Sequence, residues 1–142
     1  MNGQTINPAN GHTTQGKSGI MRCRDRDNGQ LQREEELRDG KFIGLVRFYK
    51  DGKRFSEHVV NEQGNRDGLF REFLPDGQVM REATYRNGKL IGISRSWYQS
   101  GRLKRVDFQG DNRKEAVVEY NTRGQLKELK CADRPMLENL AD

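Results

Sequence analysis

The sequence contains no apolar run long enough to cross a bilayer and no apolar core of a secretory signal. It also has only two cysteines, two histidines and three prolines among 142 residues. Cys23 and Cys131 lie near opposite ends of the patterned region, so we expect free thiols and a reducing cytoplasm. His12 and His58 have no cysteine or second histidine at a metal-binding spacing, so the sequence predicts no metal site and no cofactor.

Apolar residues are scarce as well, at 32% of the chain, while charged residues reach 33%. That balance excludes a thick globular core, yet one tryptophan, four tyrosines and six phenylalanines are too many for a wholly disordered chain. A thin, one-layer structure with much exposed surface reconciles the two observations. The net charge of +5 suits an acidic protein, a nucleic acid or an anionic membrane, and it does not choose among them.

Glycine supplies the clearest positive pattern, an evenly spaced repeat from Gly44 to Gly68 and again to Gly92. Asp-Gly and Asn-Gly pairs recur along the same region, and they favour tight hairpins because both residues tolerate positive φ. No helix separates the strand-length segments between the turns. We therefore predict an all-β fold, an elongated single-layer antiparallel meander of stacked β-hairpins. The expected strands include 45–50, 55–60, 69–74, 79–85, 93–98, 103–108, 116–120 and 126–131.

The register of the central units places an aliphatic, an arginine and an aromatic side chain on one face, because residues at i, i+2 and i+4 of a strand point the same way. Arginine and aromatic residues are also the types that most often anchor protein interfaces. A purely structural role for these side chains, with the partner on the opposite face, stays open. The residues that we predict to contact a partner are Arg47, Tyr49, Arg71, Phe73, Arg95 and Trp97, with Tyr120 as an outer contact.

Glutamates are interleaved with these arginines. Counting back from the turn at Asp76-Gly77 places Glu82 opposite Arg71, which predicts a cross-strand ion pair. Glu57 holds the matching position in the previous unit. The run 34–36, three glutamates in succession, is interpreted as a solvated strand edge.

The two ends of the chain depart from the repeat. Residues 1–20 are rich in Gly, Asn, Thr and Gln and almost free of apolar side chains, so we expect a disordered leader before a repeat domain at 21–131. In the segment 132–142, Asp133 can act as a helix N-cap and Pro135 fits the first turn. A short C-terminal helix that caps the sheet is therefore expected there.

Residues 11–18 match the P-loop expression Gly-x-x-x-x-Gly-Lys-Ser. A working P-loop joins a buried strand to a helix whose first amides hold phosphate. No apolar strand precedes Gly11, and a strand-like segment follows Ser18. We therefore predict no nucleotide binding and, with no catalytic constellation elsewhere, a protein that is not an enzyme.

The segments 44–53, 68–78 and 92–102, with the connecting segment 85–92, resemble the MORN repeat in its bacterial variant, built from units like Gly-x-x-x-x-x-Tyr-x-x-Asn-Gly-Lys. The resemblance covers roughly residues 21–131. It implies a twisted single-layer sheet of consecutive hairpins. Bacterial members of this variant are commonly associated with toxin–antitoxin or toxin–immunity pairs, and others act as membrane-proximal or protein-binding scaffolds.

The expected function is therefore that of a cytoplasmic immunity or antitoxin protein, which binds a cognate toxin directly and takes no small-molecule substrate. A general scaffold that docks a protein or an anionic membrane is the first alternative. Binding of single-stranded nucleic acid is the second, because arginines interleaved with aromatic rings can hold stacked bases. The glutamates among those arginines disfavour it.

Overall fold

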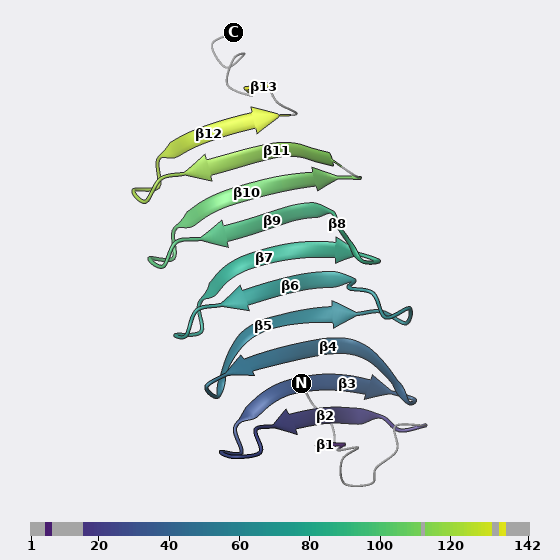
Figure 1. Ribbon diagram of the computed structural model, residues 1–142. Helices are drawn as coiled ribbons and strands as arrows, with labels where there is room; N and C mark the ends of the chain where they lie inside the picture. Colours follow the sequence, from purple (N-terminus) through teal and green to yellow (C-terminus); the bar gives the residue numbers. More distant parts are fainter. Residues whose placement is uncertain (1–4, 7–15, 112, 132–133, 136–142) are drawn as a thin grey trace.

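The computed structural model describes residues 5–6, 16–111, 113–131 and 134–135, which form one open sheet of thirteen strands (Figure 1). Strands β2 to β7 and β9 to β13 are antiparallel to their neighbours in chain order, β1 pairs in parallel with β2, and β8 pairs only with β7. The strands are β1 Thr5–Ile6, β2 Gly19–Arg24, β3 Leu31–Arg38, β4 Lys41–Lys50, β5 Lys53–Val60, β6 Gly68–Phe73, β7 Val79–Arg86, β8 Lys89–Leu90, β9 Gly92–Trp97, β10 Leu103–Gly110, β11 Arg113–Tyr120, β12 Leu126–Cys131 and β13 Arg134–Pro135.

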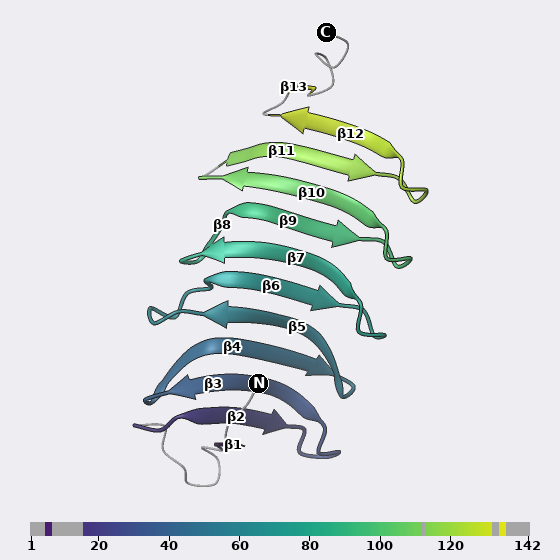
Figure 2. The same ribbon diagram turned by 180° about the vertical axis from the view of Figure 1, so that it is seen from behind.

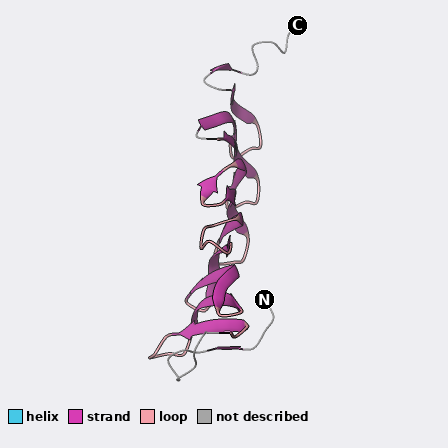
Figure 3. Ribbon diagram, turned by 90° about the vertical axis from the view of Figure 1, so that its right-hand side faces the viewer, coloured by secondary structure: helices cyan, strands magenta, loops and turns pink. Residues whose placement is uncertain are grey.

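The sheet is a single layer. The same succession of strands is visible from behind (Figure 2), and the edge-on view shows a narrow column with no second layer among the described residues (Figure 3). The predicted all-β single-layer meander is confirmed. Because the described strands have no second layer against them, both of their faces meet solvent wherever neighbouring side chains do not cover them.

The predicted tight turns are present, and their backbone explains their sequence. Asp39 and Gly40, which join β3 to β4, have φ values of 48° and 83°. Asn87 and Gly88, which join β7 to β8, have φ values of 49° and 88°. Positive φ at both central residues matches the right-handed twist of the flanking strands, which is why Asp-Gly and Asn-Gly recur.

The repeated glycines have a separate cause. Gly44, Gly68 and Gly92 lie at φ values of 110°, 116° and 83°, a region that side chains rarely tolerate. At Gly44 a Cβ would also lie 2.8 Å from Oε2 of Glu36. The even spacing of these glycines thus marks one strand position per unit that a residue with a side chain could adopt only with strain, in addition to the turns.

A β-bulge accompanies each of five hairpins, close to the turn at the aromatic end of the strands. The bulges fall at Cys23/Arg24, Phe48/Tyr49, Glu72/Phe73, Leu103/Arg105 and Glu119/Tyr120. Each bulge adds a residue to one strand only. The number of residues between equivalent positions in successive units can therefore be slightly larger or smaller than the spacing of the repeated glycines.

The core is thin and unusually polar. Its buried apolar side chains are Ile20, Leu37, Val46, Phe73 and Ala83. Glu34, Glu35, Ser56 and Glu57 are equally buried. So little apolar burial gives modest stabilisation, and satisfied polar contacts must do more to hold adjacent strands together.

Both predicted chain ends need correction. The leader does not extend to residue 20, because β2 begins at Gly19, Ile20 is fully buried, and Thr5–Ile6 pairs with Ile20 and Met21. The predicted C-terminal helix is not supported: Arg134–Pro135 forms strand β13 against β12, and the remaining residues of 132–142 lie outside the described part. Pro135 is tolerated there because an outermost strand needs no further N–H donor on its free side.

No helix occurs among the described residues, so that part of the chain offers no helical membrane span.

Candidate functional site

One face of the sheet carries a row of alternating arginine and glutamate, one residue on each of strands β2 to β7 and on β9. Side chains directly opposite each other across antiparallel strands lie on the same face. The strand register therefore places this row on a single face, here termed the ladder face. The row, termed the ionic ladder, consists of Arg22, Glu34, Arg47, Glu57, Arg71, Glu82 and Arg95.

Ion pairs link most neighbouring members of the ladder. Arg71 Nε lies 3.1 Å from Glu82 Oε2, so the predicted cross-strand pair is confirmed. Arg95 Nη1 lies 3.3 Å from the other oxygen of Glu82, which is thereby shared between two arginines. At the far end, Arg22 Nε lies 2.9 Å from Glu34 Oε2. The ladder arginines thus have carboxylate partners within the chain, which weakens the case for nucleic-acid binding through them.

Glu57 is the most heavily engaged carboxylate of the ladder, and only 7% of its surface is exposed. Its Oε2 accepts a hydrogen bond from Arg47 Nε at 3.1 Å and lies 3.5 Å from Arg54 Nη1. Its Oε1 lies 3.6 Å from Arg71 Nη1. Three guanidinium groups from β4, β5 and β6 therefore converge on one buried carboxylate.

The prediction that the glutamate run 34–36 is a solvated strand edge is wrong for Glu34 and Glu35, because only 6% and 8% of their surfaces are exposed. Burial disfavours a charged Glu34, but hydrogen bonds from Tyr49 and Arg22 outweigh it and hold the pKa of this carboxyl below its usual range. The Tyr49 hydroxyl donates a short hydrogen bond to Glu34 Oε1. Burial and this carboxylate together raise the pKa of Tyr49. Tyr49 is thus tied into the sheet.

The predicted aromatic residues occupy one end of the ladder face, each opposite a residue of the next strand. Phe73 faces Val79 and is buried, with the guanidinium of Arg54 4.5 Å from its ring centroid. Trp97 faces Leu103, and Tyr120 faces Leu126. Tyr49 and Phe73, two of the residues predicted to contact a partner, therefore make contacts within the sheet. Trp97 and Tyr120 keep part of their surface open.

Beyond Arg95 the ladder row continues without charge. Val106 on β10, Val118 on β11 and Leu129 on β12 succeed one another opposite the last arginine. The flanking rows there are apolar too, and Ile93, Phe108 and Leu126 remain 38%, 37% and 44% exposed. We term this surface the apolar patch; it comprises Ile93, Trp97, Leu103, Val106, Phe108, Ala116, Val118, Tyr120, Leu126 and Leu129.

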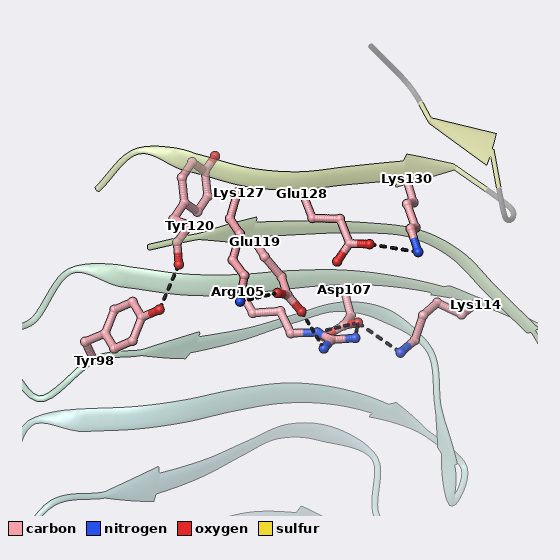
Figure 4. Close-up of polar contacts among 9 residues, drawn as sticks. All are labelled: Tyr98, Arg105, Asp107, Lys114, Glu119, Tyr120, Lys127, Glu128 and Lys130. Atoms are coloured by element: carbon pink, nitrogen blue, oxygen red, sulfur yellow. Dashed lines mark hydrogen bonds and ion pairs between the residues drawn. The ribbon is translucent and has the colours of Figure 1, made fainter. Parts of the chain in front are cut away.

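The opposite face of the same strands is charged (Figure 4). Arg105 binds Asp107 through Nε at 2.9 Å and Glu119 through Nη1 at 2.8 Å, and Lys114 Nζ lies 3.1 Å from Asp107. Burial raises the pKa of Asp107, but hydrogen bonds from Arg105 and Lys114 prevail and lower it. Strands β9 to β12 therefore have one apolar face and one face closed by ion pairs, and the apolar face is the candidate binding surface.

His58 lies on the face opposite the ladder, with its ring stacked 6.0 Å from that of Phe48. Burial lowers the pKa of His58, and the charges of Arg66 and Arg33 lower it further, against a smaller opposing effect of Glu35. His58 lies within strand β5, and no cluster of three potential metal ligands occurs among the described residues.

This environment predicts that protonation of His58 destabilises the fold. The folded pKa lies below the ordinary value of 6.5, so the contribution to stability is complete above pH 6.5 and is lost as the pH falls through the folded value. We expect urea midpoints to fall on acidification in this window and His58→Phe to flatten the decline. The loss of stability expected as the pH falls below 4.5, the ordinary pKa of Glu34, should persist in that variant, because the folded pKa of Glu34 is lowered. An unchanged pH profile in His58→Phe would contradict the assignment.

The P-loop-like segment enters the sheet directly. Residues 11–15 lie outside the described part, but Lys17 and Ser18 lead into strand β2 rather than a helix. The Lys17 carbonyl accepts from the Gly40 amide at 2.8 Å, and Ser18 Oγ accepts from the Asp39 amide at 3.0 Å. The described geometry therefore lacks the helix N-terminus that a phosphate-binding loop requires.

Comparison with known proteins agrees with the repeat architecture. A family model described as the MORN repeat variant matches residues 66–87, which span β6 and β7 with their turn. No curated protein and no solved structure matches the chain. The match covers one unit of the array, and the other hairpins repeat its strand and turn arrangement. It supports the MORN repeat family and, with it, a repeat scaffold suited to binding proteins.

Proposed function

We propose that this chain is a non-enzymatic scaffold that binds another protein through the apolar patch. The observation that carries the proposal is an apolar surface across β10 to β12, extended on β9 by Ile93 and Trp97 on either side of Arg95, on a sheet that has no second layer among the described residues. Contiguous exposed apolar surface of this kind marks an interaction site in soluble proteins. Trp97 and Tyr120, two of the aromatic residues expected to contact a partner, lie within it.

The partner that we propose is a cognate toxin, which the chain neutralises by direct binding in the cytoplasm. Support comes from the resemblance to the MORN variant, whose bacterial members are commonly associated with toxin–antitoxin and immunity pairs. The arrangement of the faces is compatible with this role, because a sheet of paired strands presents a preformed surface, which limits the entropy cost of binding.

The test is co-expression with the product of the neighbouring reading frame. We expect that product to arrest growth alone, and we expect the chain to restore growth and to co-purify with it. Val118→Arg, which places a charge in the centre of the apolar patch, should abolish both effects, whereas Glu62→Gln in an exposed turn should leave them intact. Absence of rescue and co-purification with the unmodified chain would refute the toxin as partner.

A further inference from the structure

Two arginines border the apolar patch at the turns on its aromatic side. Arg102 follows the turn between β9 and β10, and Arg123 lies in the turn between β11 and β12. Together with Leu103, Tyr120 and Gly124 they line an open hollow of about 510 Å³. Arg102 Nη1 lies 3.4 Å from where a Cβ of Gly124 would be, so its guanidinium reaches across to the next hairpin.

These two arginines differ from those of the ionic ladder. In the described part of the chain, neither guanidinium has a carboxylate within ion-pair distance, whereas Arg47, Arg71 and Arg95 each have one. The nearby acidic groups point elsewhere: Asp107 and Glu119 belong to the opposite face. Arg102 and Arg123 therefore retain unused donors beside an apolar surface.

The charge of this half of the sheet is also unbalanced. Residues 92–131 contain nine Lys and Arg and five Asp and Glu, a difference of +4. Of the five carboxylates, Asp107, Glu119 and Glu128 lie on the opposite face and Asp111 lies at the far turn. Glu115 lies against Gly110 beside that far turn, at the end of the strands away from Arg102 and Arg123. The ladder face of β9 to β12 thus combines apolar side chains with positive charge at its edge.

We propose that the apolar patch takes an acidic amphipathic segment of a partner protein, with the apolar side chains of that segment on the patch and one or more of its carboxylates between Arg102 and Arg123. This rests on the proposed function, because it specifies the chemistry of the protein that the scaffold binds. Arginine binds carboxylates through charge-assisted hydrogen bonds in a planar, two-pronged geometry. A segment lacking acidic residues would leave both guanidinium groups without a carboxylate partner.

A protein segment fits this surface better than an anionic membrane does. Leu126 is the most exposed large apolar side chain of the patch, at 44%. No large apolar side chain of the patch is therefore more than half exposed, so none stands clear of its neighbours to be buried among lipid headgroups. The hollow beside Tyr120 is instead of a size that can receive individual side chains.

The experiment is selection of dodecapeptides from a random phage-displayed library on the immobilised full chain. We expect the selected peptides to combine Leu, Ile, Phe or Trp with Asp or Glu. A fluorescein-labelled selected peptide should then bind Arg102→Gln/Arg123→Gln at least about tenfold more weakly than the unmodified chain. The variant loses two charge-assisted contacts, and the loss of each is expected to weaken binding several-fold or more. Its affinity should also fall as salt rises, because the contact is exposed.

The matched control is Arg26→Gln/Arg86→Gln, which removes the same charge from two exposed positions outside the patch. It should bind as the unmodified chain does, and thermal unfolding should show both double variants folded. Selected peptides without acidic residues, or equal binding by both double variants, would overturn this inference and leave the scaffold function standing. Acidic peptides obtained alongside failed toxin rescue would support the inference and refute the toxin.

Vesicles of phosphatidylcholine with phosphatidylglycerol provide the remaining comparison. We expect no flotation of the chain with them at physiological salt. Flotation that Arg102→Gln/Arg123→Gln abolishes would assign the two arginines to a membrane surface and overturn the proposal of an acidic protein segment.

Discussion

Replacement of Glu57 by alanine is expected to lower the free energy of unfolding by about 2–3 kcal/mol, the largest loss for any single exposed or buried carboxylate of the sheet. The change removes the carboxylate that Arg47, Arg54 and Arg71 share, and within the described part of the chain it leaves only Arg71 with another ion-pair partner, Glu82. These arginines are 21%, 39% and 38% exposed, so water relieves part of their repulsion. The expected loss is for that reason below the range for fully buried pairs.

Urea unfolding followed by far-ultraviolet circular dichroism and by Trp97 fluorescence measures this effect. Glu57→Gln retains a hydrogen-bond acceptor without the charge and should fall between alanine and the unmodified chain. Glu62→Ala, an exposed turn position, should change stability by less than about 0.5 kcal/mol. A Glu57→Ala variant as stable as Glu62→Ala would show that the ionic ladder does not hold the strands together.

Val106→Glu is expected to separate stability from binding. Val106 lies directly opposite Arg95, whose ion pair with Glu82 leaves other guanidinium donors available. A glutamate there would extend the ionic ladder by one strand, so unfolding free energy should change by less than about 1 kcal/mol. The same charge would interrupt the apolar patch. Affinity for the protein partner should fall on the order of 30-fold, which corresponds to about 2 kcal/mol.

Val118→Glu is the matched control, because Val106 and Leu129 flank Val118 and provide no cation. It should lose partner binding and about 2 kcal/mol of stability together, since its charge is half-buried and unpaired. The measurements are urea midpoints, toxin rescue and the fluorescence of anilinonaphthalenesulfonate, a dye that binds exposed apolar surface. If both variants keep rescue and dye binding, the apolar patch is not the binding surface.

Local features of this fold were predictable because they depend on few residues. Asp-Gly and Asn-Gly turns need positive φ wherever they occur, and the Arg71–Glu82 pair lies one hairpin turn apart in the chain. The burial of Glu34 was missed because bulges change the spacing. The step along the chain from Glu34 to Glu57 is shorter than the step from Glu57 to Glu82, so a strictly regular repeat does not align the three.

The apolar patch could not be predicted without the register of β10 and β12, the return strands of the last two hairpins. Val118 was recognisable as the residue that replaces arginine in the last unit, but its neighbours Val106 and Leu129 lie on strands whose register the repeat alone does not define. The C-terminal helix was predicted from capping residues, but Arg134 and Pro135 pair with the open edge of β12 instead. Backbone groups on an outer strand favour a partner strand over an isolated short helix.

The alternation of the ionic ladder sets a rule of parity for the growth of the array. Arginine lies on β2, β4, β6 and β9 and glutamate on β3, β5 and β7, so the charge pattern has a period of two strands along the stack. Duplication or deletion of a whole hairpin preserves the sequence of opposite signs. Insertion of a single strand would reverse the chain direction beyond it and bring two like charges into register. Within the ionic ladder, the array can therefore gain or lose charged strands without a like-charge contact only in even steps.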